Sequence, residues 1–218
     1  MRRLRFRRRM LISNGTRLSA AMIADWNAAG LTDLQLSVDG VAPSATTQKV
    51  LDMLRPKLAL LAEHARFRVV LNAVLGSAPP AEAEAVVAAA RELGFAPRVL
   101  LVHDAAGGLA LGRAERADHA RRLGPRLTGG YRRALLEHGR APFKCRSGAR
   151  YLYIDEHGRI AWCSQTREHF GADLTSYGYA DLRAQFAAHK PCHATCTLGC
   201  ARTASAFDGW RPQSGPAV

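Results

Sequence analysis

The sequence predicts an α/β fold in which a parallel sheet is followed by a small cysteine-rich α+β segment, made of a hairpin and a helix. Two observations lead to this prediction. Strand-like and helix-like runs alternate at regular spacing over residues 11–102, which is typical of βαβ units. All five cysteines lie in the last third of the 218 residues, and the first 144 residues contain none. The C-terminal third is therefore expected to be organised differently from the rest.

Four strands and three helices are expected in the first part. The strands fall where apolar or β-branched residues cluster: the first ends at Leu11 and Ile12 as a buried strand, and the others cover residues 34–40, 67–75 and 97–102. The helices follow residues that begin or stop helices. They run from Ser19 to Gly30, from Thr46 or Thr47 to about His64 with an interruption near Pro56, and from Pro79-Pro80 to Gly94. Strands joined by helices favour a parallel sheet.

The stretch of residues 104–141 differs in composition from both neighbours. It contains two Gly-Gly pairs and two arginine-rich helical runs, residues 111–123 and 131–139. We interpret it as a linker with two short basic helices, whose basic face is either solvated or borders an anionic ligand. The predicted domains are then residues 1–103, 104–141 and 142–210, and residues 179–189 form a helix that leads to Cys192.

Polar residues follow the predicted strands of the first part. In parallel α/β folds the carboxyl ends of the strands form the edge that holds ligands. Each polar residue can also simply cap the helix that comes next. The residues at this edge are Asn14, Ser37, Asp39, Asn72, His103 and Asp104.

The five cysteines form two groups. Cys145 and Cys163 have the spacing C-x12-G-x4-C around Gly158, with aromatic and β-branched runs on both sides of the sequence Asp-Glu-His-Gly. This pattern predicts a hairpin that brings the two sulfurs together. Cys192, Cys196 and Cys200 have the spacing C-x3-C-x3-C, which lets thiolates converge on one helix face or in a loop. Together the two groups predict a metal site.

The residues alone leave the metal open. Zinc takes four tetrahedral cysteine or histidine ligands, and His189 and His193 lie next to the second group. Iron–sulfur clusters take thiolates, four for a cubane. The other interpretation is buried free thiols. Disulfides are disfavoured, because five is an odd number and no secretory segment is visible.

Charge and hydropathy indicate whether the protein is expected to bind nucleic acid or membranes. The net charge is +13, and six arginines lie within the first ten residues. This charge could serve nucleic acid or an anionic membrane, but aromatic residues are not interleaved with the basic ones as single-strand binding requires. No apolar run reaches the roughly 18 residues of a membrane span. We expect a cytoplasmic protein that does not bind membranes, with nucleic acid a disfavoured partner.

Two parts of the chain resemble one family. The sequences SNGTRLS (residues 13–19) and LQLSVDG (residues 34–40) are similar to motifs at the ends of consecutive barrel strands in radical SAM enzymes. The hairpin pair and the C-terminal cysteine group resemble the auxiliary-cluster extension of that family, the SPASM or twitch domain. The order of the motifs matches, and the resemblance covers most of residues 10–205.

The resemblance implies a fold, a cofactor and a chemistry. The first part would correspond to strands three to six of a six-stranded partial barrel of the TIM-barrel type. The C-terminal cysteines would hold one auxiliary [4Fe–4S] cluster, which binds substrate or passes electrons. The family cleaves S-adenosylmethionine (SAM) reductively to a radical that abstracts a substrate hydrogen. By the resemblance, Ser37 and Asp39 lie near the SAM ribose, and Asn14 lies near the adenosyl pocket.

The chain departs from the family in one important respect. The catalytic cluster of radical SAM enzymes is bound by a C-x3-C-x2-C loop, and no cysteine precedes Cys145 here. We therefore expect a fragment of a longer enzyme or one part of a split enzyme, which does not cleave SAM unaided. A partner chain could supply the missing strands, and without it the open sheet edge predicts association or poor solubility. The alternatives are a zinc-stabilised basic module that binds nucleic acid, and a scaffold without metal.

Overall fold

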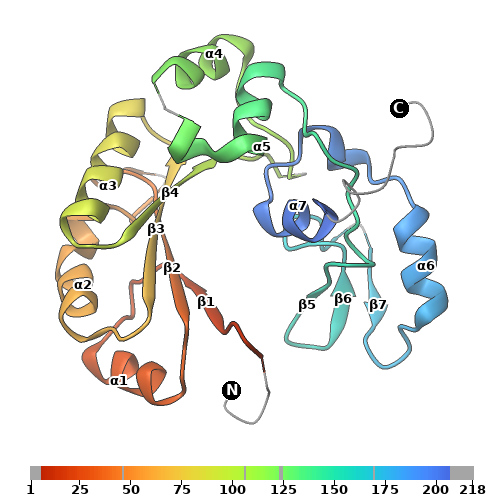
Figure 1. The fold of residues 1–218 in the computed structure, drawn as a ribbon, viewed down its shortest axis with the longest axis horizontal. Helices are drawn as coiled ribbons and strands as arrows, with labels where there is room; N and C mark the ends of the chain where they lie inside the picture. The colour runs from red at the N-terminus through yellow and green to blue at the C-terminus, as the bar shows by residue number, and fades with distance from the viewer. Residues whose placement is uncertain (1–5, 46, 106, 123–124, 169, 207–218) are drawn as a thin grey trace. The chain divides into compact units, whose positions relative to one another are not determined.

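The computed structural model describes residues 6–45, 47–105, 107–122, 125–168 and 170–206 (Figure 1). The chain divides into two compact units. The first lies within Met1–Val102 and Leu111–Arg133, and the second lies within His103–Ala110 and Ala134–Val218. The stretch between the predicted sheet and the cysteines is therefore shared between the two units.

The first unit is built on a four-stranded parallel sheet with the order β1-β2-β3-β4. The strands are β1 (Met10–Ser13), β2 (Asp33–Val38), β3 (Arg68–Leu75) and β4 (Ala96–Leu101). Helices α1 (Ala20–Ala28), α2 (Leu51–His64) and α3 (Pro80–Glu92) connect them and lie on one side of the sheet (Figure 1). Two further helices follow, α4 (Arg113–Arg122) and α5 (Pro125–His138). The predicted α/β class with a parallel sheet is confirmed, as are the two basic helices.

The core of this unit lies between the sheet and its helices. Alternate residues of β2, namely Leu34, Leu36 and Val38, are fully buried, and four leucines of α2 are 1–2% exposed. Burying one such side chain contributes about 1.5–3 kcal/mol. Helix α1 begins where expected, since the Ser19 side chain accepts a hydrogen bond from Met22 N. A glycine with positive φ follows α1 and α3 as predicted.

Helix α2 differs from the expectation at its start and at its proline. It begins at Leu51 rather than at Thr47, and Thr46 lies outside the described residues. Val50 is extended and forms an isolated bridge with Gly40, so the chain is still held beside the end of β2. The helix also continues through Pro56. Loss of one helical hydrogen bond there is offset by the buried leucines on both sides of the proline.

Strand β1 is present, but it is not the buried strand that was predicted. Ile12 is 68% exposed and Met10 is 37% exposed. The strand pairs with β2 on one side only, and an edge strand lacks the neighbour that would cover its apolar side chains. The apolar sequence was correct evidence for a strand and misleading evidence for burial.

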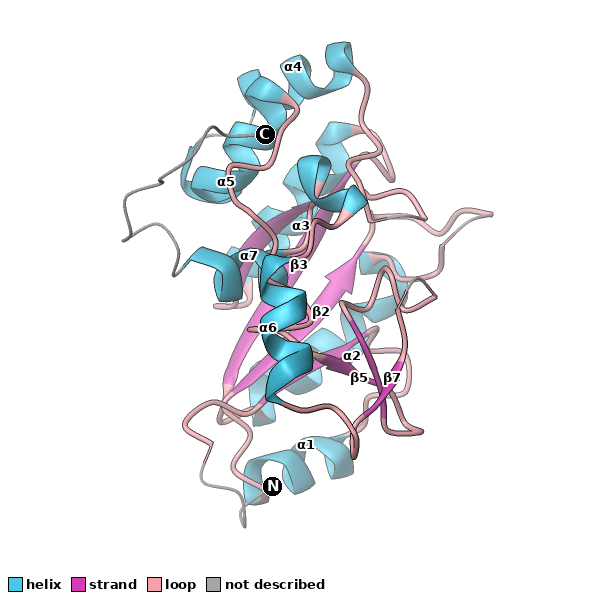
Figure 2. Cartoon of the chain, turned by 90° about the vertical axis from the view of Figure 1, so that its right-hand side faces the viewer, coloured by secondary structure: helices cyan, strands magenta, loops and turns pink. Residues whose placement is uncertain are grey.

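The second unit contains a three-stranded antiparallel sheet and short helices. Strands β5 (Tyr153–Ile154) and β6 (Arg159–Ala161) form the predicted hairpin, and β7 (Ala172–Asp173), which was not expected, pairs with β6. Helix α6 (Tyr179–Ala187) lies beside this sheet (Figure 2). The 3-10 helix η1 (Pro191–Thr195) and helix α7 (Gly199–Ser205) follow.

The hairpin turn shows why its four residues were a reliable signal. Asp155 Oδ1 accepts hydrogen bonds from the backbone N–H groups of His157 and Arg159 at 2.9 and 2.8 Å. Gly158 has φ +77°, and a Cβ at this position would meet nothing within 4 Å. The glycine is needed for its backbone conformation, as expected for a turn of this kind. The turn fixes the register in which Tyr153 faces Ala161.

No helix among the described residues is long and apolar enough to span a membrane.

Candidate metal centre

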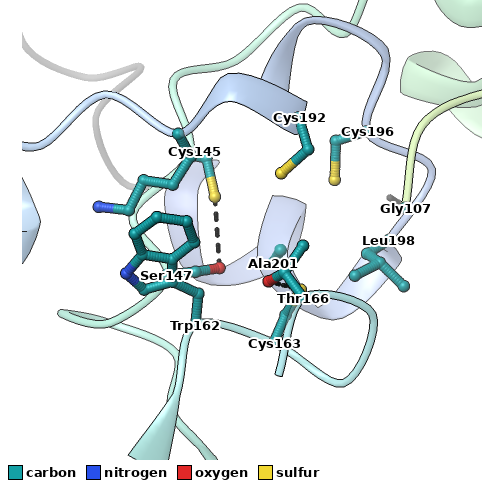
Figure 3. A pocket seen from close by; sticks show the side chains of 11 residues that line it. Gly107, Cys145, Ser147, Trp162, Cys163, Thr166, Cys192, Cys196, Leu198 and Ala201 are labelled. Atoms are coloured by element: carbon teal, nitrogen blue, oxygen red, sulfur yellow. Dashed lines mark hydrogen bonds between the residues drawn. The ribbon is translucent and has the colours of Figure 1, made fainter. Parts of the chain in front are cut away.

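Four of the five cysteines line one cavity of the second unit. Cys145, Cys163, Cys192 and Cys196 line a small cavity of about 10 Å³. Figure 3 shows the sulfur atoms of Cys145, Cys192 and Cys196 directed toward a common space, with Cys163 on its other side. Three of the thiols, Cys145, Cys163 and Cys196, are only 4–6% exposed, and Cys192 is half-buried. We refer to this site as the cysteine cavity.

Different elements bring these four residues together. Cys145 precedes a tight turn whose Arg146 N donates to Ser205 Oγ of α7 at 2.8 Å. Cys163 comes two residues after β6, where Thr166 N donates to Cys163 O at 3.2 Å. Cys192 lies in η1, which is tied back by Ala141 N to Ala194 O at 2.7 Å. Cys196 lies between η1 and α7, so the site depends on the folding of the whole second unit.

Cys200 does not belong to the cavity. It is exposed at the start of α7, and Tyr151 is its hydrogen-bonding neighbour. Burial raises the pKa of Tyr151, and the hydrogen bond with Cys200 raises it further. The three cysteines of the C-x3-C-x3-C group thus lie on three different pieces of backbone, and the structure brings only two of them to the cavity.

The thiols of the cavity influence one another electrostatically. Burial raises the pKa of Cys196 to about 12, the neighbouring thiols add to this effect, and a hydrogen bond from the Leu198 backbone N–H opposes it. Burial likewise raises the pKa of Cys192, with contributions from Cys145 and Cys163. Several thiolates in a buried site repel each other, so they can coexist only next to positive charge, such as that of metal ions.

One positive group is already part of the cavity wall. Lys190 is only 1% exposed, and its ammonium donates hydrogen bonds to the carbonyl oxygens of Gln185 and Ala188. The ammonium also lies 5.6 Å from the centroid of the Trp162 ring. Burial lowers the pKa of Lys190, and the proximity of Cys145 opposes that effect. Sequence reasoning missed this residue, because a single lysine in a basic chain gives no signal of burial.

Two hydroxyl groups touch the sulfur atoms. Cys145 Sγ donates to Ser147 Oγ at 3.3 Å, and Cys163 Sγ lies 3.1 Å from Thr166 Oγ1 (Figure 3). Ser147 is 1% exposed and Thr166 is 3% exposed. Both residues follow their cysteine within a few positions, at i+2 and i+3. A sequence signal for them therefore existed, but hydroxyl residues near cysteines are too common to stand out.

The sulfur atoms line the same cavity but are not arranged as the ligands of a single metal ion. Among the described side chains, no three of His, Cys, Asp or Glu come close enough to hold a single metal ion. His189 is exposed, and the side chain of His193 lies outside the described set. As it stands, the donor set is four thiols spread around a space.

The residues predicted to lie near SAM are in the first unit. Asn14 and Asp39 follow β1 and β2, and Ser37 lies within β2, so they share the carboxyl edge of the sheet. Asn14 is exposed, and its Oδ1 accepts hydrogen bonds from the Thr16 backbone and hydroxyl at 3.2 and 2.9 Å. Asp39 accepts from Thr47 Oγ1 at 2.8 Å and forms an ion pair with Lys49 at 3.1 Å. These contacts shape the loops after the strands.

Comparisons of the chain with protein families, with curated proteins and with solved structures found no match.

Proposed function

We propose that the chain binds one [4Fe–4S] cluster in the cysteine cavity through Cys145, Cys163, Cys192 and Cys196, and that it forms part of a radical SAM-type enzyme. The observation that carries this proposal is the convergence of four buried or half-buried thiols from separate segments on one cavity. Four thiolates are the ligand set of a cubane cluster. Cys200 is left over as a fifth cysteine without a role as ligand.

The arrangement of the potential ligands in the structure does not match a site for a single zinc ion. Structural zinc needs its sulfur ligands at about 2.3 Å from one ion, and no three potential ligands among the described side chains gather in that way. A cluster of several iron and sulfide atoms needs the sulfurs around a larger space. The buried ammonium of Lys190 also suits a group whose four thiolates make it negatively charged overall.

The residues around the cavity would hold the cluster and keep water away from it. Such a cluster supplies one-electron transfer when it is bound. Trp162, Leu198 and Ala201 provide apolar wall, which lowers the local dielectric constant and strengthens the effect of Lys190 and of the hydroxyl groups.

We further propose that the parallel sheet of the first unit is the counterpart of part of a radical SAM barrel. The support is the ordered pair of motifs at the ends of β1 and β2 and the parallel strand order. Reductive cleavage of SAM is not assigned to these 218 residues, because they contain no C-x3-C-x2-C loop. Contact of Asn14, Ser37 and Asp39 with SAM remains a prediction from the resemblance.

The test is the metal content of the protein after anaerobic reconstitution with iron and sulfide. About four iron and four sulfide per chain, with broad visible absorbance near 400 nm, are expected for one cubane cluster. Stoichiometric zinc in a colourless protein would favour the zinc module, and the salt dependence of nucleic-acid binding would then be measured. A protein that contains no iron, sulfide or zinc would favour the third interpretation, a scaffold without metal.

A further inference from the structure

The hydroxyl of Ser147 is built into the wall of the cysteine cavity. It lies 3.3 Å from Cys145 Sγ and is shielded from solvent, since the residue is 1% exposed. The turn that contains it is fixed by Gly148 N donating to Tyr151 O at 2.8 Å and by an isolated bridge between Ser147 and Tyr151. The backbone therefore holds this hydroxyl against the sulfur before any ligand binds.

The hydroxyl of Thr166 has the same relation to Cys163. Thr166 Oγ1 lies 3.1 Å from Cys163 Sγ, and the residue is 3% exposed. The turn from Cys163 to Thr166 closes with Thr166 N donating to Cys163 O. Two separate turns thus place one buried hydroxyl in contact with Cys145 Sγ and another in contact with Cys163 Sγ.

Metal binding changes which atom donates in these contacts. A cysteine that ligates a metal is a thiolate without a proton. The only hydrogen left between Ser147 Oγ and Cys145 Sγ is then the one on the hydroxyl, and the same holds for Thr166 and Cys163. Because both hydroxyls are buried and leaving them unpaired is costly, each is directed to donate to the sulfur.

We propose that Ser147 and Thr166 raise the reduction potential of a cluster in the cysteine cavity by donating hydrogen bonds to Cys145 Sγ and Cys163 Sγ. This proposal rests on the proposed function, because it requires the cluster. Reduction adds one electron, supplied by an external donor such as dithionite, and no bond to sulfur forms or breaks. The reduced state carries one more negative charge and gains more from the two donors than the oxidised state.

The test is an anaerobic redox titration of reconstituted wild type, Thr166→Val and Ser147→Ala. The titration is monitored through the electron paramagnetic resonance signal of the reduced cluster. Valine keeps the branched shape of threonine and has a methyl group in place of the hydroxyl. Each variant is expected to lower the equilibrium constant for one-electron reduction about tenfold, which corresponds to a potential about 59 mV more negative.

Two control variants separate this effect from general damage. Thr166→Ser keeps the hydroxyl and should retain the wild-type potential. Thr203→Val removes an exposed hydroxyl of α7 that donates to Gly199 O, and it should also leave the potential unchanged. Unchanged potentials in both Thr166→Val and Ser147→Ala, or equal shifts in Thr203→Val, would overturn the proposal.

The outcome is distinguishable from failure of the proposed function. Wild type without iron and sulfide would contradict the cluster itself, whereas a loaded wild type with unaffected variant potentials contradicts only the role of the hydroxyls. If Thr166→Val and Ser147→Ala do not take up iron, resonance Raman spectra of the wild type and Thr166→Ser in H2O and D2O decide. Iron–thiolate stretching bands that shift on deuteration support the proposal, and bands that do not shift overturn it.

Discussion

Lys190 is a charged side chain enclosed almost completely by the protein. Its ammonium donates hydrogen bonds to the carbonyl oxygens of Gln185 and Ala188 at the end of α6, and the residue is part of the lining of the cysteine cavity. Burying a charge is costly unless it is compensated. Hydrogen bonds to neutral carbonyls compensate it in part, and a negatively charged cluster would complete the compensation.

The first prediction concerns this charge. Lys190→Met should release iron to a chelator about tenfold faster than wild type, because it removes a buried positive charge from the wall of the cavity and so destabilises a negatively charged cluster. The measurement is the decay of visible absorbance in excess chelator. Lys144→Met is the matched control, since Lys144 is exposed and adjacent to Cys145. Equal release rates in the two variants would show that the buried charge is irrelevant to cluster retention.

Asp33 provides a pH-dependent contribution to stability in the first unit. Arg8 donates to both of its carboxylate oxygens at 3.0 and 2.8 Å, and Thr32 donates to it at 2.8 Å. The hydrogen bond from Arg8 is the main reason that the pKa of Asp33 lies below its ordinary value; Thr32 and the charge of Arg68 contribute, and burial opposes them. A carboxyl group with a depressed pKa stabilises the fold above its unfolded pKa, and that stability is lost as the pH falls through the folded pKa.

The second prediction concerns the stability that the ionised Asp33 carboxylate contributes above its pKa. Asp33→Asn should lower the free energy of unfolding at pH 7 by about 1–2 kcal/mol, a value kept small because Arg8 is more than half exposed. The difference from wild type should begin to shrink as the pH falls below about 4, near the pKa of the unfolded carboxyl, and should disappear below the lowered pKa of the folded one. Urea denaturation at several pH values measures both effects. The control is Asp52→Asn, which removes an exposed partner of Arg55 and should change the free energy of unfolding by no more than a few tenths of a kcal/mol at any of these pH values. A difference between Asp33→Asn and wild type that does not depend on pH would refute the role of the Asp33 carboxylate.

Among the elements, the connection after β3 contains a glycine at which any side chain would be strained. Gly76 has φ +95°, and a Cβ there would lie 2.3 Å from Val102 Cγ1 and 2.6 Å from Leu111 Cδ2. Both the backbone conformation and the space are therefore restricted. Gly94 after α3 also has positive φ, +71°, but a Cβ there would meet nothing within 4 Å.

The third prediction compares these two positions. Gly76→Ala should destabilise the protein by about 2–4 kcal/mol, since overpacking adds to the backbone penalty. Gly94→Ala should cost only about 1–2 kcal/mol, from the backbone alone. Chemical denaturation of the two variants under the same conditions measures the difference. Equal losses would mean that the contacts of Gly76 with Val102 and Leu111 relax at no cost.

Local signals in the sequence were enough for most elements of the fold. The serine cap of α1, the glycine after α3 and the aspartate and glycine of the hairpin turn act through hydrogen bonds and φ values of their own segment. Pro56 and the start of α2 were misjudged, because buried leucines and a bridge to Gly40 outweigh local preference there. Strand β7 was missed since two residues carry no detectable periodicity, and its pairing with β6 depends on the fold of the unit.

In the candidate site too, features set by local sequence were predicted and features set by tertiary packing were not. Spacing predicted that Cys145 and Cys163 come together, because a hairpin is a local structure. It did not separate Cys196 from Cys200, which have equal spacing but differ in position, one buried in the cavity and one exposed on α7. Lys190 was not predicted as part of the site, because its burial involves Trp162, which is distant in the sequence.

For the whole molecule, strand β1 is a sheet edge that carries exposed apolar side chains. It is the end strand of its sheet, and Ile12 is 68% exposed there. Edge strands with exposed apolar side chains pair readily with other chains, and charged residues at such positions prevent this.

The fourth prediction tests this edge. Ile12→Lys should reduce self-association at micromolar concentrations with little change in the free energy of unfolding. Met53→Lys is the control, because Met53 is 56% exposed on α2 and lies away from the sheet edge. Sedimentation velocity of the wild type and the two variants gives the result. A wild type that is monomeric throughout, or equal effects of the two substitutions, would contradict association through β1.

The cluster assignment can be tested by the iron and sulfide content of five single cysteine-to-serine variants after the same anaerobic reconstitution. If the cysteine cavity holds a cluster through four thiolates, substitution of Cys145, Cys163, Cys192 or Cys196 should remove most of the iron and sulfide. Cys200→Ser should retain the wild-type amounts, because Cys200 is exposed and lies outside the cavity. Loss of the cluster in Cys200→Ser, or full retention in any of the other four, would contradict the assignment of ligands.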